Sequence, residues 1–265
     1  KRKKIKLQHG LSPELHVMEC DFVIEDLDSG EFNILSACDD MNPLTAKEIE
    51  NPKLKKILLA QFRRDKIEQH TTNFLYKYSP WIYFSTYKRS LERFYQMRQQ
   101  VLNPINKMYF RGYSEHRPIL NYFDKSLLEG FSPIPNCDSY FEDLIKHKIG
   151  LSIAGNGELC YRDIEYMSIG MPFIRFEYKS KFLAPLIPNY HYISVERPDD
   201  FPKVNGIDTD RLGSEKHAKK IEQRFLEVRE DVEFINFIAQ NAKKYYDNYL
   251  APDKRLEITA RELGL

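Results

Sequence analysis

Two short apolar runs near the start of the chain, residues 16–24 and 32–37, are separated by a turn-forming sequence at residues 28–30. This pattern predicts a strand, a turn and a second strand. Residues 45–70 carry apolar side chains at helical spacing, so we expect a helix there that is interrupted at Pro52. The opening of the chain is therefore predicted to contain two strands followed by a helix.

The rest of the chain predicts a parallel α/β sheet. Pro80 argues against one unbroken helix in the aromatic segment 74–87, and residues 88–101 have helical spacing. Beyond residue 107 strands and helices alternate: strand 107–110, helix 118–128, helix 141–147, strand 149–154, helix 160–169, strand 172–176 and strand 190–195. Such alternation is typical of parallel sheets, which bind ligands beyond the carboxyl ends of their strands.

The C-terminal part is helical in pattern, with helices expected at residues 214–228 and 233–249. We therefore predict an α/β protein of three parts. Residues 1–105 form an N-terminal lobe, residues 106–210 form a second lobe with the parallel sheet, and residues 211–265 are helices that pack back on the lobes.

The composition excludes several classes of protein. Of the 265 residues, 42% are hydrophobic and 30% are charged, and the formal net charge is +1. A disordered chain would be less hydrophobic, and a domain that binds a polyanion would usually have a strong basic excess. The basic run at residues 1–6 has no interleaved aromatic residues, so we interpret it as a solvated terminus. These features predict a globular protein with no nucleic-acid partner.

The apolar stretches are all shorter than the roughly 18–20 residues that a membrane-spanning helix needs, so we expect no membrane span. The start Lys1-Arg2-Lys3-Lys4 has no apolar signal core, which favours a cytoplasmic location, with a secretory compartment as the alternative. We expect free thiols at the four scattered cysteines, with one or two disulfides as the alternative. They are Cys20, Cys38, Cys137 and Cys160.

The first candidate site lies at residues 151–165, where an apolar strand leads through small residues into a helix. Free backbone N–H groups and the helix dipole favour a phosphate there, which predicts a nucleotide-diphosphate site. Arg162 could hold a diphosphate, and Glu165 on the same helix face could accept hydrogen bonds from a ribose diol. An ordinary strand-to-helix turn with a surface Arg–Glu pair is the alternative. The candidate binding residues are Gly155, Asn156, Gly157, Tyr161, Arg162 and Glu165.

The second candidate site follows the predicted strand 107–110 and contains Arg111, Gly112 and Arg117. Two arginines beside a glycine can approach an anionic ligand closely and bind phosphate oxygens in bidentate fashion. Solvated arginines are the alternative. Because both sites lie at carboxyl ends of strands in one predicted sheet, we expect them to line a single crevice.

A third candidate site is the pair Asp39 and Asp40 after the strand 32–37. A carboxylate that leaves a strand toward a cleft is well placed to act as a general base on a hydroxyl nucleophile. Such residues before a proline also make ordinary turns and helix caps, which is the alternative. The chain has no spaced Asp-x-Asp arrangement and no histidines at ligand spacing, so we predict no obligatory metal.

Taken in order, five segments resemble glycosyltransferase family 90, which includes protein O-glucosyltransferases and fungal capsule xylosyltransferases. Residues 38–43 look like the family's Arg-Asp-x-Pro segment, and residues 79–84 look like its Pro-x-Trp segment. Residues 110–117 resemble its Phe-Arg-Gly…Arg segment, and residues 157–165 resemble its Gly…Ser-x-Arg turn and helix. Residues 187–195 look like its Pro-x-x-His-Tyr-Ile-Pro-Val strand. The last segment is the most specific match.

The resemblance spans about residues 15–250 and implies a two-lobed GT-B-like glycosyltransferase with Rossmann-like parallel sheets. It implies inverting, metal-independent transfer of xylose or glucose from a UDP-sugar to a hydroxyl of a glycan or glycoprotein, without a cofactor. The family's catalytic aspartate falls at Asp40, with Asp39 as the alternative, because Asp40 lies three residues before Pro43 whereas the family places its aspartate two before. The arginines that match positions near the diphosphate are Arg111, Arg117 and Arg162.

Trp81 could stack on a sugar face, and a core anchor is the alternative interpretation of this residue. By analogy with glycan-building members, the compact chain favours xylose over glucose as the donor sugar. Two other functions stay open. One is an exostosin-like UDP-sugar transferase with another donor, and the other is a non-catalytic glycan-binding protein on the same fold.

Overall fold

A computed structural model describes residues 5–9, 21–36, 50–59, 78–80, 91–111, 116–130, 137–155, 158–204 and 207–264. The chain divides into two compact units. The first comprises residues 1–84, 179–185 and 252–265, and the second comprises residues 85–178 and 186–251. The first division thus falls at residue 84, earlier than the expected 105, and the C-terminal helices are shared between the units.

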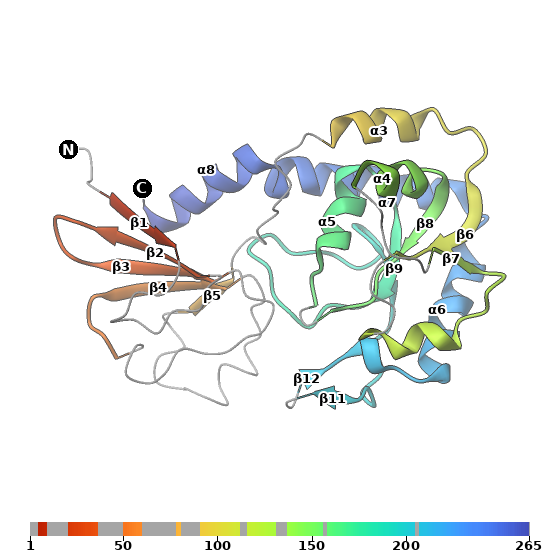
Figure 1. The fold of residues 1–265 in the computed structure, drawn as a ribbon, viewed down its shortest axis with the longest axis horizontal. Coiled ribbons are helices and arrows are strands. Elements are labelled where there is room, and N and C mark those ends of the chain that lie inside the picture. The colour runs from red at the N-terminus through yellow and green to blue at the C-terminus, as the bar shows by residue number, and fades with distance from the viewer. Residues whose placement is uncertain are drawn as a thin grey trace. The chain divides into compact units, whose positions relative to one another are not determined.

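The first unit contains a mixed sheet in the order β1-β2-β3-β4-β5 (Figure 1). The strands are β1 (Ile5–His9), β2 (Asp21–Asp26), β3 (Phe32–Ser36), β4 (Leu54–Leu59) and β5 (Tyr78–Pro80). Pairing is antiparallel among β1, β2 and β3 and parallel among β3, β4 and β5. Helix α8 (Pro252–Leu263) belongs to this unit, and Lys56 of β4 donates a hydrogen bond to its Glu262 carbonyl at 3.0 Å.

The turn between β2 and β3 confirms the predicted strand–turn–strand start. Asp26 Oδ1 accepts hydrogen bonds from the N–H groups of Asp28 and Ser29 at 2.9 and 3.3 Å. Gly30 has φ of 69°, a left-handed conformation that glycine adopts at little cost. Local turn chemistry therefore sets the register of this hairpin.

The helix expected at residues 45–70 is wrong where the structure describes it, because residues 54–59 form strand β4. Leu54, Ile57 and Leu58 are spaced like one helix face, and all three are buried. Parallel pairing of β4 with β3 on one side and β5 on the other decides the conformation instead. A short apolar run is compatible with either element, and here the sheet contacts outweigh the local spacing.

The second unit is built on a parallel five-stranded sheet in the order β10-β9-β8-β6-β7, which confirms the predicted α/β class. Its strands are β6 (Ile105–Tyr109), β7 (Leu128–Glu129), β8 (His147–Leu151), β9 (Phe173–Phe176) and β10 (Ile193–Val195). Its helices are α3 (Glu92–Gln99), α4 (Cys137–Leu144), α5 (Tyr161–Ser168), α6 (Glu215–Val228) and α7 (Val232–Tyr245), which continues as a π-helical turn over Tyr246–Leu250 (Figure 1). A short hairpin, β11 (Lys203–Val204) with β12 (Ile207–Asp208), completes the unit.

Helices cover both faces of this parallel sheet. Ile149 and Leu151 of β8 join one core cluster with Ile221 and Phe225 of α6. Gly150, between them in sequence, faces the other side and lies against Tyr166 of α5. Because successive strand residues alternate in direction, the nearly continuous apolar run of β8 is explained by burial on both faces.

The helix expected at residues 118–128 is also wrong. A 3-10 turn at Pro118–Tyr122 is followed by a turn in which Asp124 Oδ1 accepts a hydrogen bond from the Ser126 N–H at 2.7 Å. Leu128 then begins β7 and pairs with Met108 of β6. The aspartate ends the helical conformation by offering the backbone an alternative acceptor.

Replacing Gly150 by alanine should destabilise the protein. The new Cβ would lie 2.6 and 2.7 Å from two ring atoms of Tyr166, which is closer than normal contact allows. The Tyr166 hydroxyl lies 3.1 Å from the carbonyls of Tyr109 and Leu151, so the ring cannot move without losing these interactions. We expect a loss of about 1–3 kcal/mol in the free energy of unfolding, measured by urea denaturation.

The matched control is Lys146→Ala, an exposed position just before the same strand, which should change stability little. Equal denaturation midpoints for Gly150→Ala and the wild type would contradict the packing of Tyr166 against this strand.

Candidate functional site

The sheet of the second unit has a topological switch point between β6 and β8. From β6 the chain continues to β7 on one side, and after β7 it crosses back to β8 on the other side. In open α/β sheets, ligands bind outside the carboxyl ends of the strands at such a point. Phe110 and Arg111 follow β6 there, and residues 152–155 follow β8. The two sequence-predicted arginine sites therefore do lie at neighbouring strand ends.

Helix α5 begins at this strand end, with Cys160 as its N-cap. The Cys160 N–H donates to Asp163 Oδ2 at 2.9 Å, and the Gly155 N–H donates to Cys160 Sγ at 3.2 Å. Burial raises the pKa of the Cys160 thiol to about 11, so the thiol stays protonated at neutral pH. Cys160 therefore serves the local structure at the start of α5, and Tyr161 next to it is exposed.

Arg162 extends from α5 to the end of β6. Its Nε and Nη2 donate hydrogen bonds to the Arg111 carbonyl at 3.2 and 2.7 Å. Its guanidinium lies 4.1 Å from the centre of the Phe110 ring, a cation–π distance. Arg162 is only 9% exposed, and its Nη1 has no hydrogen-bond partner among the described residues. A buried cationic N–H without an acceptor costs free energy, so this atom is suited to an incoming anion.

Arg117 brings a second positive charge to the same ring. Its guanidinium lies 5.7 Å from the Phe110 ring centre, and its Nε donates to the Ile153 carbonyl at 3.4 Å. Burial lowers the pKa of Arg117, and the nearby charge of Arg162 lowers it further. The two cations repel each other where little water screens them, and an anion bound beside them would relieve this repulsion.

Gly155 makes the approach of Arg117 possible. A Cβ atom at this position would lie 3.2 Å from Arg117 Nη2. The small residue after β8 therefore leaves space beside the guanidinium.

Arg111 and Glu165, which were predicted to bind the donor, are both engaged with the protein. Arg111 Nη1 forms an ion pair with Asp143 of α4 at 2.6 Å. Glu165 is buried, and its Oε2 accepts a hydrogen bond from the Tyr140 hydroxyl at 2.6 Å. The geometry ties both side chains to α4, and their predicted contacts with a diphosphate and a ribose stay predictions.

A buried ion pair that the sequence did not suggest holds α5 against the sheet. Asp163 Oδ2 lies 2.6 Å from Arg175 Nη1, and both side chains are fully buried. Asp163 also accepts hydrogen bonds from the hydroxyls of Ser152 and Tyr178. Arg175 stacks on the Tyr178 ring at 3.5 Å and donates to the Glu158 carbonyl at 2.9 Å. An arginine inside the apolar run 173–176 was the available signal for this pair.

Asp210 is a further residue that the sequence analysis missed. It is fully buried in a 3-10 turn at Asp210–Leu212, and its Oδ1 accepts a hydrogen bond from the Ala154 N–H at 3.1 Å. Its Oδ2 is buried without a hydrogen-bond partner among the described residues. The end of β8 therefore offers a buried acceptor, just as Arg162 offers a buried donor at the end of β6.

The segment 187–195 is ordered by a buried histidine. His191 Nδ1 accepts a hydrogen bond from the Ile187 N–H at 2.9 Å, and its ring centre lies 4.9 Å from that of Tyr245. Burial lowers the pKa of His191 to about 4, which keeps the imidazole neutral and able to accept this hydrogen bond. These contacts give His191 a structural role in this segment.

Several predicted site residues lie outside the described residues. They are Asp39, Asp40, Trp81, Gly112, Asn156 and Gly157. Within the described part of the chain, no cluster of three or more His, Cys, Asp and Glu side chains is suited to a metal ion. No described helix combines the length and apolar character needed to cross a bilayer.

Comparison with known proteins gives likenesses in structure and none in sequence. No protein-family model matches the chain, and no curated protein matches it. A solved glycosyltransferase from Rickettsia africae ESF-5 resembles it with a TM-score of 0.48 and 13% identity, over 86% of this chain and 70% of that one. WaaG, a glycosyltransferase involved in lipopolysaccharide biosynthesis, resembles it with a TM-score of 0.41 and 10% identity, over 80% of this chain and 63% of that one.

The replacement Asp163→Asn should strongly destabilise the second unit. It removes the carboxylate that faces Arg175, so a fully buried cation would lose its counter-charge. Breaking one side of a buried ion pair typically costs about 3–5 kcal/mol, and we expect a loss of that size in the free energy of unfolding. Chemical denaturation measures this loss. The control Glu215→Gln breaks an exposed ion pair with Lys219 and should leave the denaturation midpoint unchanged. A loss of stability for Asp163→Asn as small as that of the control would contradict the importance of the buried ion pair.

His191 should make stability depend on pH. Its pKa is lowered from 6.5 to about 4 in the folded protein, so the stabilisation is complete above pH 6.5 and is lost as the pH falls toward 4. Between pH 7 and 5 we expect this residue to account for a loss of roughly 1–2 kcal/mol. The measurement is urea denaturation of the wild type and His191→Gln at both pH values. The idea fails if the two proteins lose stability equally over this interval.

Proposed function

We propose that the chain is an inverting, metal-independent glycosyltransferase that moves xylose or glucose from a UDP-sugar to a hydroxyl of a glycan or glycoprotein. The observation that carries this proposal is the buried Nη1 of Arg162, which has no hydrogen-bond partner among the described residues, at the topological switch point of the sheet. Three features support a nucleotide-sugar site around this atom: the nearby positive charge, the hydrogen-bonding capacity of Asp210 and the sequence resemblance.

The charge around Phe110 favours a phosphate-containing ligand. Arg162 and Arg117 both lie within cation–π distance of this ring. Arginine binds phosphate oxygens through fixed, planar N–H groups, and two arginines match the spread charge of a diphosphate. The amino end of α5 adds the partial positive charge of the helix dipole.

Asp210 supplies a hydrogen-bond acceptor, whereas Arg162 and Arg117 supply donors. A buried carboxylate oxygen without a donor is suited to accept a hydrogen bond from a hydroxyl group. A nucleoside diphosphate carries both an anionic group and ribose hydroxyls. We propose that the diphosphate binds near Arg162 and Arg117 and that a hydroxyl of the same ligand donates to Asp210.

The sequence resemblance narrows the ligand to a UDP-sugar and gives the reaction. In the proposed reaction an acceptor hydroxyl attacks the anomeric carbon opposite to UDP, and Asp40, or Asp39, takes the proton from this hydroxyl. The bond from the anomeric carbon to the diphosphate breaks with inversion of configuration. Negative charge then develops on the UDP leaving group, and Arg162 and Arg117 stabilise it.

Replacing Arg162 by methionine should weaken UDP binding by about 10- to 100-fold, because hydrogen bonds to charged groups contribute about 1.5–3 kcal/mol. Turnover of UDP-xylose or UDP-glucose should fall by about 100-fold or more. Isothermal calorimetry measures the first effect and release of UDP the second. The matched control is Arg93→Met, an exposed arginine on α3, which should leave both values unchanged.

A panel of UDP, GDP and dTDP in a thermal-shift assay tests the nucleotide. Stabilisation by UDP alone agrees with the proposal, and stabilisation by GDP alone contradicts it. UDP binding without transfer to any glycan acceptor would favour the non-catalytic glycan-binding alternative. Asp40→Asn should abolish transfer while UDP still binds, and wild-type turnover by both Asp40→Asn and Asp39→Asn would reject the assignment of the base.

A further inference from the structure

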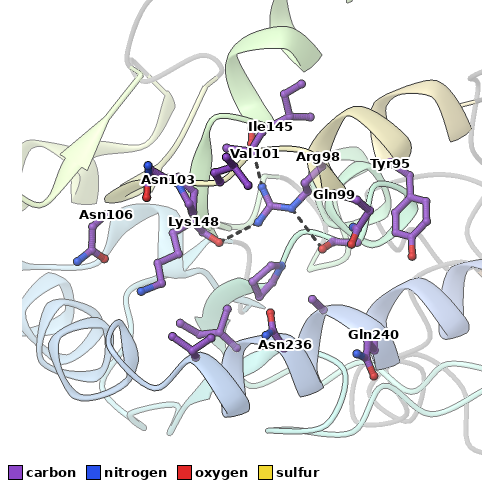
Figure 2. Close-up of a pocket in the computed structure, with 17 residues that line it drawn as sticks. Tyr95, Arg98, Gln99, Val101, Asn103, Asn106, Ile145, Lys148, Asn236 and Gln240 are labelled. Carbon is purple, nitrogen blue, oxygen red and sulfur yellow. Dashed lines mark hydrogen bonds between the residues drawn. The ribbon is translucent and has the colours of Figure 1, made fainter.

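A cavity of about 690 Å³ lies at the opposite end of the same sheet (Figure 2). Its walls come from α3, the connection 101–104, the first residues of β6 and β8, the turn before β9, and α7. These strands are parallel, so their amino ends meet here and their carboxyl ends meet at the candidate site. The volume lies within the range of small-molecule sites, roughly 300–1,000 Å³. The cavity is therefore large enough for a ligand and separate from the site around Arg162.

Arg98 of α3 brings a positive charge to the floor of this cavity. Its guanidinium donates hydrogen bonds to four backbone carbonyls, those of His147 at 2.7 Å, Lys148 at 3.1 Å, Ile145 at 3.2 Å and Gly170 at 3.4 Å. A guanidinium has five N–H groups, so one remains for a ligand. No carboxylate pairs with Arg98 within the part of the chain that the structure describes. Burial lowers its pKa to about 10, so it stays charged at neutral pH.

Lys148 is the other cation of the cavity lining. Its ammonium donates to the Arg229 carbonyl, and the Glu230 carboxylate lies 3.9 Å away on a side chain that is 70% exposed. The Lys148 side chain is only 15% exposed, so water screens this pair mainly on the side of Glu230. The described lining contains Arg98 and Lys148 but neither aspartate nor glutamate. The electrostatic balance of the cavity therefore favours an anion.

Amide side chains surround the cations. Figure 2 shows Gln99 of α3 on one side of the cavity and Asn236 and Gln240 of α7 on the other. Asn103 and Asn106 lie on the connection and the first strand. Asn106 Nδ2 donates a hydrogen bond to the Glu230 carboxylate at 2.8 Å. An amide carries both donors and acceptors, which is the pattern that binds neighbouring hydroxyl groups of a sugar. Ile145 and Ile235 are buried lining residues that can contact the apolar face of a sugar ring.

We propose that this cavity binds an anionic sugar, whose phosphate or carboxylate contacts Arg98 and Lys148 and whose hydroxyls bind the amides. The site goes beyond the proposed transferase function and does not depend on it. A phosphorylated sugar and a sugar acid share this chemistry, and separate probes distinguish them.

The experiment is calorimetric titration of the full chain with glucose-6-phosphate, glucuronate, glucose and inorganic phosphate. We expect glucose-6-phosphate or glucuronate to bind at least about tenfold more tightly than glucose, because the anion adds charge-assisted hydrogen bonds. Lys148→Met should weaken binding of the preferred anionic sugar by about tenfold or more. The double replacement Asn236→Ala with Gln240→Ala should weaken the anionic sugar but not inorganic phosphate. Lys244→Met, an exposed lysine of α7 outside the lining, is the matched control.

The two sites are separable in the same titrations. Lys148→Met should leave UDP affinity unchanged, and Arg162→Met should leave the affinity for the anionic sugar unchanged. The proposal is overturned if neither anionic sugar binds more tightly than glucose, if Lys148→Met binds it like the wild type, or if Arg162→Met abolishes its binding. These variants test the cavity without replacing Arg98, whose printed hydrogen bonds all go to backbone carbonyls.

Discussion

The buried pair of Asp163 and Arg175 is the interaction on which the arrangement of the candidate site depends. The pair joins the first turn of α5 to β9. A hydrogen bond from the Ser152 hydroxyl to the Asp163 carboxylate joins the same turn to the segment after β8. A buried ion pair contributes little net stability when its desolvation is counted, but losing one partner is costly. The pair therefore acts mainly by fixing where α5 begins. Arg162, one residue earlier in the chain, reaches the end of β6 because α5 is held in this position.

Arginine side chains lie at both ends of the sheet of the second unit. At the carboxyl end Arg162 and Arg117 share the Phe110 ring, and one buried nitrogen of Arg162 has no acceptor among the described residues. At the amino end Arg98 is bound to backbone carbonyls only, within the described chain. Carbonyl dipoles and aromatic rings orient a guanidinium but do not neutralise it.

The sequence predicted four strands of the parallel sheet, β6, β8, β9 and β10, because turns and helices bound these apolar runs. It missed β7, which begins where a helix over residues 118–128 was expected. It failed at β4, where Leu54, Ile57 and Leu58 fit a helix face and only pairing with β3 and β5 decides between the elements. Arg117 and Arg162 were predicted because each follows a strand closely. Asp210 could not be predicted in this way, because it contacts Ala154 across 56 residues of sequence and no local sequence pattern indicates such a contact.

The central claim is that Arg162 Nη1 is an anion-binding atom of a nucleotide-sugar site. The most direct measurement is a crystal structure of the chain with UDP. The account predicts a diphosphate oxygen within hydrogen-bond distance of Arg162 Nη1, at the carboxyl ends of β6 and β8. A UDP molecule bound elsewhere on the protein, with Arg162 Nη1 still lacking an acceptor, would contradict it.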